Sequence, residues 1–494
     1  MNKIGFDNQK YISIQSEKIK ERISQFGGKL YLEFGGKLFD DYHASRVLPG
    51  FKPDSKIKML LNLKEQAEIV IVISADDIEK NKLRSDLGIP YDVDILRLID
   101  VFREIELYVG GVVITHFSGQ HSAVAFEHRL QQLGIKVYKH YLIEGYPSNI
   151  PLIISENGYG KNDYIETTRS LVVVTAPGPG SGKMAVCLSQ LYHEHLRGIK
   201  SGYAKFETFP IWNIPLKHPT NLAYEAATAD LNDVNMLDPF HLEAYGIKSV
   251  NYNRDVEIFP VLEAMFNQIY GYCPYKSPTD MGVNMAGNCI IDDEVVKEAS
   301  RNEIIRRYYQ AMCRKVQGKA STDETYKIEL LMKQGGCSNN TRPCIRMALQ
   351  KEADTQAPAV CVELNDGRLI TGKTSSLLGA SSAVLLNCLK ALGDIPDDVT
   401  LISPKIIEPV QDLKTQYLGN RNPRLHTDEV LVALSICAVT DEYARIAMNQ
   451  LHKLKGCEAH STVILSQTDE NTFRKLGFNI TYEPKYQNKK LYHK

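Results

Sequence analysis

The first 200 residues alternate short apolar runs with segments of helical character. Apolar residues dominate five runs, at residues 29–34, 68–73, 111–116, 136–143 and 171–174. Such continuous hydrophobicity is typical of strands that are covered on both faces. Helical segments lie between them, for example at residues 94–105 and 122–130. The pattern predicts an α/β fold with a mostly parallel, Rossmann-like sheet, right-handed crossovers and helices on both faces.

The chain has 494 residues, which is too long for one ordinary core and favours two to four domains. We expect an N-terminal α/β domain at residues 1–235 and a loop-rich, helical middle region at 236–323. A C-terminal α/β sandwich should follow at residues 324–494. The polar stretch 318–324 marks the last boundary.

The C-terminal part opens with a hairpin signal. Asp366-Gly367 separates two short strand-like runs within residues 361–372. A helix is expected at residues 380–392, and strands at 399–403 and 462–466 would complete the sandwich.

The most specific motif is a glycine-rich turn between an apolar run and a helical segment. Gly178, Gly180, Ser181, Gly182 and Lys183 form a P-loop-like turn, in which backbone N–H groups and a helix N-terminus can surround a phosphate. The turn departs from the strict phosphate loop in two ways. Pro177 takes the place of the first glycine, and Met184 replaces the hydroxyl residue that would bind Mg²⁺. We predict a phosphate or nucleotide site here, while a loop that serves only packing stays an open alternative.

Ligands of parallel sheets bind beyond the carboxyl ends of the strands. The loops expected there include the Gly35-Gly36-Lys37 turn, which we interpret mainly as a plain turn, and the loop 177–183. Asp76 or Asp77 could hold Mg²⁺, although we interpret them mainly as residues that cap the N-terminus of a helix.

Three further side chains are candidates for catalysis. His116 and His121 follow a strand-like run, where a general base would be useful. Arg254 could bind a phosphate or carboxylate. Structural hydrogen bonds for the histidines and an ion-pair network for Arg254 remain alternatives.

Zinc is not expected. The ten cysteines form no C-x-x-C pair and should be buried, reduced thiols. Only Cys337 and Cys344 merit a test of reactivity. His193 and His195 are two residues apart on one expected helix, so they point in different directions and cannot share a metal ion.

The amino-acid composition argues against some classes of binding partner. The chain carries 58 basic and 59 acidic residues, for a net charge of −1, which argues against a nucleic-acid partner. The sequence contains neither an apolar run of bilayer length nor the apolar core of a signal peptide, so we predict no membrane partner and a cytoplasmic location. Assembly into a homo-oligomer stays open.

Four segments carry a family resemblance over essentially the whole chain: residues 34–51, 176–183, 224–230 and 251–255. They resemble the bacterial uncharacterised protein family 0371, also called domain of unknown function 1846, which carries no assigned activity. The resemblance therefore implies a family rather than a reaction.

The C-terminal part also looks like the cytidine-deaminase type of sandwich, in fold only. Residues 381–383 and 404–408 stand where that family places its metal motifs, with Lys405 and Glu408 in place of the thiolates. The zinc ligands are absent, so the resemblance does not imply deamination.

Together these observations favour a cytoplasmic enzyme that uses a nucleotide, with Mg²⁺, or another phosphorylated small molecule. Phosphoryl transfer is the reaction that fits best, because positioned charge supplies most of its catalysis. The alternative is a non-catalytic binding or scaffold protein whose glycine-rich loop is structural.

Overall fold

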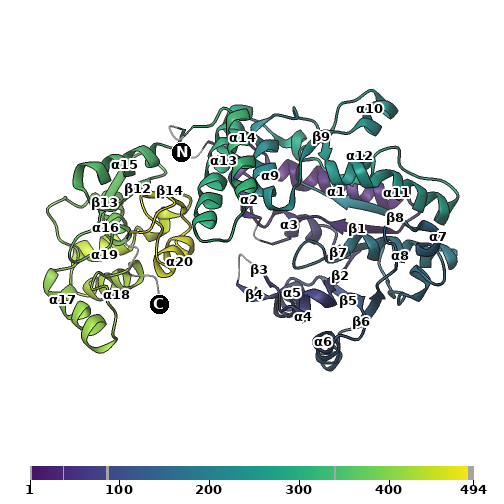
Figure 1. The fold of residues 1–494 in the computed structure, drawn as a ribbon, viewed down its shortest axis with the longest axis horizontal. Helices are drawn as coiled ribbons and strands as arrows, with labels where there is room; N and C mark the ends of the chain where they lie inside the picture. Colours follow the sequence, from purple (N-terminus) through teal and green to yellow (C-terminus); the bar gives the residue numbers. More distant parts are fainter. Residues whose placement is uncertain (1–2, 37, 40, 85–87, 339–340, 488–494) are drawn as a thin grey trace. The chain divides into compact units, whose positions relative to one another are not determined.

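The computed structural model describes residues 3–36, 38–39, 41–84, 88–338 and 341–487 (Figure 1). The chain divides into two compact units. One contains residues 4–225 and 232–299, and we call it the N-terminal unit. The other contains residues 226–231 and 300–494 with the first three residues, and we call it the C-terminal unit. Each unit is described by itself.

A seven-stranded sheet forms the centre of the N-terminal unit, and every pairing in it is parallel. In spatial order the strands are β11 (Gly282–Val283), β8 (Gly202–Phe206), β1 (Leu30–Phe34), β7 (Leu171–Thr175), β2 (Ala67–Ser74), β5 (Tyr108–Phe117) and β6 (Val137–Tyr141). The predicted α/β fold with a parallel sheet is therefore confirmed, and each of the five predicted runs contributes a strand.

Helices cover both faces of this sheet. The helices of the unit are α1 (Asn8–Gln25), α2 (Tyr42–Val47), α3 (Ser55–Leu61), α4 (Ala75–Glu79), α5 (Tyr91–Glu104), α6 (His121–Gln132), α7 (Ile150–Ile153), α8 (Lys183–Leu196), α9 (Pro219–Ala227), α10 (Pro239–Tyr245), α11 (Asn253–Tyr270) and α12 (Pro278–Met281). Short 3₁₀ turns lie at η1 (Tyr159–Lys161) and η3 (Ala286–Cys289), and the small antiparallel pairs are β3 (Leu83–Arg84) with β4 (Ile89–Pro90) and β9 (Asn235–Leu237) with β10 (Val250–Tyr252).

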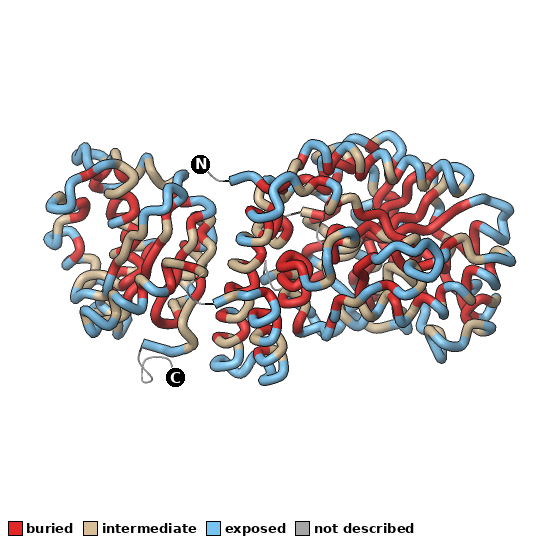
Figure 2. Tube along the Cα trace, turned by 90° about the horizontal axis from the view of Figure 1, so that it is seen from above, coloured by how far each residue is buried: buried red, intermediate tan, exposed pale blue. Residues whose placement is uncertain are grey.

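The alternation of strand side chains decides which helix covers which face. Val70 and Val72 of β2 share a core cluster with Val174 of β7 and with α8 and α11. Ile71 and Ile73 point to the other face, where α5 packs against β2 and β5. Figure 2 shows buried residues concentrated along the strands. Burial on both faces explains why these runs are apolar without alternation.

The order of the strands creates a topological switch point between β7 and β2. After β2 the chain continues to β5 and β6, toward one side of the sheet. After β7, which lies between β1 and β2, the chain crosses β1 to reach β8, toward the other side. The loops after β7 and β2 therefore leave the same edge in opposite directions. Ligands of open α/β sheets bind in the crevice at such points.

The C-terminal unit contains a four-stranded sheet in the order β13 (Leu369–Lys373), β12 (Ala359–Glu363), β14 (Glu458–Ser461) and β15 (Asn479–Tyr482). β12 is antiparallel to both neighbours, and β14 is parallel to β15. The pairing of β12 with β13 confirms the predicted hairpin. The other elements are η2 (Ala229–Leu231), α13 (Asp293–Val316, from residue 300 onward), α14 (Thr322–Gln334), α15 (Pro343–Thr355), α16 (Ala380–Leu392), α17 (Pro404–Asp412), η5 (Leu413–Tyr417), α18 (Thr427–Cys437), α19 (Glu442–Met448), η6 (Leu451–Leu454) and α20 (Gln467–Lys475).

Two strand predictions in this unit were wrong, while the helix predicted at residues 380–392 was right. Residues 399–403 join the core through Leu401 and Ile402 but pair with no strand. The strand expected at 462–466 lies instead at residues 458–461. Apolar, β-branched residues signalled burial in both places, but burial does not require a ladder of hydrogen bonds.

The likenesses to a phosphate loop and to the cytidine-deaminase sandwich, and the three-part domain division, remain predictions. In the part of the chain that is described, no helix combines the length and the hydropathy needed to cross a bilayer.

Candidate functional site

The glycine-rich loop is fixed to the carboxyl edge of the large sheet. Thr115, near the end of β5, donates a hydrogen bond from Oγ1 to the carbonyl oxygen of Ser181 at 2.7 Å. The same hydroxyl lies 3.3 Å from the carbonyl oxygen of Ile73 on β2. The loop after β7 is therefore held at the ends of β2 and β5, at the switch point.

The three loop glycines meet different demands. A Cβ on Gly178 would lie 2.1 Å from the hydroxyl oxygen of Tyr91, so this position needs glycine for close packing. Gly180 and Gly182 have φ angles of +75° and +89°, which disfavour other residues. A Cβ on Gly180 would meet no atom within 4 Å. Packing thus explains Gly178, and backbone conformation explains Gly180 and Gly182.

The start of α8 offers several hydrogen-bond donors without acceptors. Gly182 caps the helix and brings no side chain to it. Among the described residues, the N–H groups of residues 180–185 find no acceptor. Ser181 is only 3% exposed, and its Oγ has no partner there either. Lys183 forms no ion pair with a described carboxylate. Such a set of donors suits an anion.

Four charged side chains, two of them buried and two partly buried, form a group at the ends of β1 and β8. We call Glu33, Lys205, Glu207 and Asp255 the Lys205 cluster. Lys205 Nζ lies 2.8 Å from Glu207 Oε1 and also pairs with Asp255, at the start of α11. Glu33 is the neighbour of Lys205 across the strands and accepts a hydrogen bond from Tyr203. Three carboxylates therefore surround one ammonium group.

This excess of buried negative charge alters how the cluster holds protons. Burial raises the pKa of Glu207 to about 7, against the opposing attraction of Lys205. Burial alone would lower the pKa of Lys205, but the charges of Asp255, Glu207 and Glu33 raise it above its ordinary value. Glu207 can thus exchange a proton near neutral pH while Lys205 stays charged.

The Lys205 cluster lies beside the glycine-rich loop. Glu33 of β1 is in register with Val174 of β7, close to the start of the loop. The thiol of Cys187, one turn after Lys183 on α8, interacts electrostatically with Glu33 of the cluster and with Lys183 of the loop. Burial and the charge of Glu33 raise the pKa of its thiol, and Lys183 opposes them. The loop and the cluster are therefore adjacent parts of one edge.

The structure brings Asp76 and His116 together at the ends of β2 and β5. Asp76 Oδ2 lies 3.9 Å from His116 Nδ1, which is also 3.4 Å from Ser74 Oγ. His116 has a φ of +51°, an uncommon conformation for a residue with a side chain. Ser74 caps α4, with its Oγ accepting from the N–H of Asp76. The side chains of Asp76 and His116 are about half exposed, so they could contact a ligand at the loop, whereas Ser74 is buried.

The remaining candidates are placed differently. Asp77 forms an ion pair with Lys82 at 3.1 Å, and His121 is the exposed first residue of α6. Arg254 Nε lies 2.6 Å from Asp233 Oδ1, which satisfies the ion-pair alternative. A Cβ on Gly35 would meet the carbonyl oxygen of Phe206 at 2.7 Å, so packing accounts for that glycine. Lys37 lies outside the described residues.

The residues that the structure describes contain no group of three or more His, Cys, Asp or Glu side chains that could hold a metal ion. The ten cysteines are free thiols. Burial raises the pKa of both Cys337 and Cys344 to about 11, so each is protonated near neutral pH.

The sequence interpretation did not identify the Lys205 cluster. Its members lie in apolar surroundings, such as Leu-Tyr-Leu-Glu33-Phe and Tyr-Ala-Lys205-Phe-Glu207. Charged residues inside runs assigned to buried strands were the available signal, because such residues are seldom buried unless paired.

The fold and this edge define an α/β protein with a seven-stranded parallel sheet and a candidate anion-binding loop. The chain matches the model of the domain of unknown function DUF1846, N-terminal, over residues 4–336, and that of its C-terminal counterpart over residues 340–492. It is 57% identical to a UPF0371 protein of Corynebacterium urealyticum over 494 residues, 99% of each chain. It is 56% identical to a UPF0371 protein of Streptococcus pyogenes serotype M5 over 494 residues, 100% of each chain. The chain belongs to this family, as its sequence segments predicted.

Proposed function

We propose that the N-terminal unit binds the phosphate of a nucleotide or another phosphorylated small molecule at the loop 177–183. The observation that carries the proposal is the set of donors at the start of α8. One loop carries backbone N–H groups, the buried hydroxyl of Ser181 and the ammonium of Lys183, and none of these groups has a partner among the residues that the structure describes. An oxyanion satisfies all of these groups at once.

The neighbouring side chains suit transfer of the bound phosphoryl group. In that reaction most catalysis comes from positioning and charge, and a base accepts the proton of the attacking hydroxyl. Glu207 is the candidate base, because burial raises its pKa to about 7. Asp76 is the carboxylate that could face Mg²⁺ at this edge, because Asp77 is paired with Lys82.

A direct binding measurement tests the proposal. The purified chain is screened by thermal shift, with and without Mg²⁺, against nucleotides, dinucleotides, coenzyme A and sugar phosphates. A ligand at about one hundred times its Kd should add roughly 2.7 kcal/mol of stability. Hits are then measured by calorimetry with Lys183→Ala, and with Lys161→Ala as the control, since Lys161 is an exposed lysine of the same unit.

The expected result is binding that Lys183→Ala weakens at least tenfold, as for loss of one charge-assisted contact, and that Lys161→Ala leaves unchanged. Equal binding by both variants would refute the role of the loop.

The second candidate function is a scaffold with a structural loop. The tight packing of Gly178 against Tyr91 favours it. If no ligand of the thermal-shift panel stabilises the protein, the scaffold function is favoured.

A further inference from the structure

We infer that the C-terminal unit pairs with a second copy of this chain through the outer side of α18. The pairing is two-fold symmetric and antiparallel, and Ile436 of each copy lies at its axis. The inference is independent of the proposed function, because every residue that it uses lies in the C-terminal unit.

The outer side of α18 is apolar and open to solvent. Val432, Ile436 and Val439 are 61%, 64% and 82% exposed. Val439 lies just beyond the last residue of the helix, and Ala438 before it keeps a helical conformation. Spacings of four and three residues place the three side chains on one side of the helix, as along the seam at which paired helices meet.

The inner side of the same helix already faces a core. Its buried residues are Thr427, Val430, Ala433, Leu434 and Cys437. The sequence contains no charged residue from position 430 to position 440. A surface helix usually turns polar residues toward the solvent, whereas a helix that is apolar on all sides is usually buried on all sides. The outer side of α18 is therefore expected to be covered.

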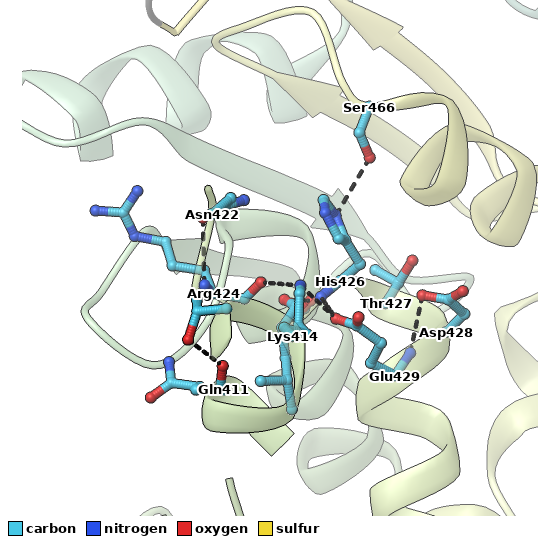
Figure 3. Close-up of polar contacts among 12 residues, drawn as sticks. Gln411, Lys414, Asn422, Arg424, His426, Thr427, Asp428, Glu429 and Ser466 are labelled. Carbon is cyan, nitrogen blue, oxygen red and sulfur yellow. Dashed lines mark hydrogen bonds and ion pairs between the residues drawn. The ribbon is translucent and has the colours of Figure 1, made fainter. Parts of the chain in front are cut away.

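Exposed apolar side chains are concentrated around this helix. Among the described residues, eight of the 32 large apolar side chains that are exposed fall within residues 406–443. The neighbouring η5 and the residue after it add three side chains that are 50–79% exposed, namely Leu413, Tyr417 and Leu418. Lys414 of η5 reaches Glu429 at the start of α18, 2.8 Å away, so the two elements lie side by side (Figure 3).

The size of this surface suits a dimer. A standard interface takes about 20 to 30 residues from each side. Residues 404–443 contain 23 exposed residues, so this segment alone can supply an interface of the smaller standard size. Two-fold dimers, in which the same surface is used twice, are the commonest oligomers of soluble proteins.

The charges around the apolar side chains favour an identical partner. Lys405 and Arg421 are exposed cations, and no described residue forms an ion pair with either. The exposed anions Glu408, Asp412 and Asp428 form no ion pair with a described residue either. Across a two-fold axis each cation of one copy can meet an anion of the other. An anionic bilayer would gain little from a surface with these carboxylates.

Antiparallel pairing places the apolar side chains of α18 against themselves. Ile436 is the middle one of the three, so it meets its own copy, and Val432 of one helix meets Val439 of the other. Ser435 lies beside them, and its hydroxyl donates to the carbonyl oxygen of Val432 at 2.7 Å. The interface therefore contains branched aliphatic side chains and no unsatisfied hydroxyl donor.

Sedimentation velocity of the full chain tests the inference. At about 1 to 100 μM we expect a species of twice the mass of one chain, whose fraction rises with concentration. Ile436→Asp should weaken the pairing roughly thirtyfold or more, as for a contact at the centre of an interface. Leu349→Asp changes an exposed leucine of α15 and should pair like the wild type. A wild-type chain that stays monomeric, or a dimer that Ile436→Asp leaves intact, overturns the inference.

A mixture of two variants tests the symmetry axis. Ile436→Asp and Ile436→Lys each place two like charges at the axis when they pair with themselves, whereas the mixed pair brings opposite charges together. We expect each variant to be monomeric alone and the equimolar mixture to pair, a recovery that also shows both variants to be folded. Thermal unfolding of each variant checks the fold separately. Folded variants that stay monomeric in the mixture overturn the place of Ile436 at the axis.

Discussion

The two units each bury a cluster of charges, and the clusters are opposite in design. In the C-terminal unit the carboxylate of Glu458 is held by two arginines, one of which, Arg306, also pairs with the buried Glu303. Glu458 lies 2.7 Å from Arg306 Nη1 and 2.8 Å from Arg342 Nη2. In the N-terminal unit one cation, Lys205, is surrounded by three carboxylates.

The pKa values of the carboxyl groups in the two clusters shift in opposite directions. Burial would raise the pKa of Glu458, yet Arg306 and Arg342 hold it below its ordinary value. The pKa of Glu207 is instead raised to about 7. A carboxylate surrounded by cations is fixed in one protonation state and stabilises the structure. A carboxylate that shares one cation with others is poised to exchange a proton, as perturbed groups at functional sites are.

The comparison predicts its largest effect for Lys205→Met. This change leaves two buried carboxylates and the partly buried Asp255 without their cation, and breaking such a buried pair costs about 3–5 kcal/mol. The loss should be greatest at pH 8 and smaller at pH 5.5, because protonation of Glu207 then removes one of the negative charges. Urea denaturation at both pH values measures it. A loss that does not depend on pH would contradict the proposed charge imbalance.

Arg342→Met should cost somewhat less, about 3 kcal/mol, because Arg306 still neutralises Glu458. Arg342 is 1% exposed, and methionine fills most of its volume. We expect the same loss at pH 5.5 and 8, since the remaining arginine keeps Glu458 charged across that range. If the stability of Arg342→Met recovered strongly at pH 5.5, the two clusters would not differ in how they respond to pH.

Glu207→Gln should change the slope of stability against pH. The pKa of Glu207 in the folded chain is about 7, above the ordinary value of about 4.5, so folding takes up a proton between these values. Stability of the wild type therefore falls as pH rises through this window. The variant should show a flatter profile between pH 5 and 7.5 by thermal unfolding. An unchanged profile would assign the proton to another group.

Asp77→Asn should have the smallest effect. Its ion pair with Lys82 is partly exposed, and such pairs contribute about 0–1 kcal/mol. We expect a Tm within a few degrees of the wild type. A large loss would show that α4 depends on Asp77.

The sequence predicted the local parts of this molecule more fully than the distant ones. Buried strand runs and the Asp366-Gly367 hairpin are visible as short patterns, and they formed. The order of the strands depends on pairings such as Leu30 with Leu171, which no short pattern encodes. Residues 399–403 show that apolar content predicts burial but not strand pairing.

The site was predictable to a similar extent. The loop 177–183 and the meeting of Asp76 with His116 followed from the rule that parallel strands gather their ends at one edge. The Lys205 cluster joins residues from 33 to 255, so only the fold reveals it. The pairing of Arg254 with Asp233 is likewise a tertiary contact between separate segments.

The insertion of β7 between β1 and β2 has a consequence for synthesis on the ribosome. β2 ends at Ser74 and β7 begins at Leu171, so roughly 100 residues must be added before the central gap of the sheet can be filled. At about 5–20 residues per second this takes roughly 5–20 seconds. During that delay β1 and β2 present unpaired edges, which are templates for wrong association. The glycine-rich loop follows directly after β7, so it emerges together with the strand that fills this gap, while β8 and β11 are still to be added on the other side of β1.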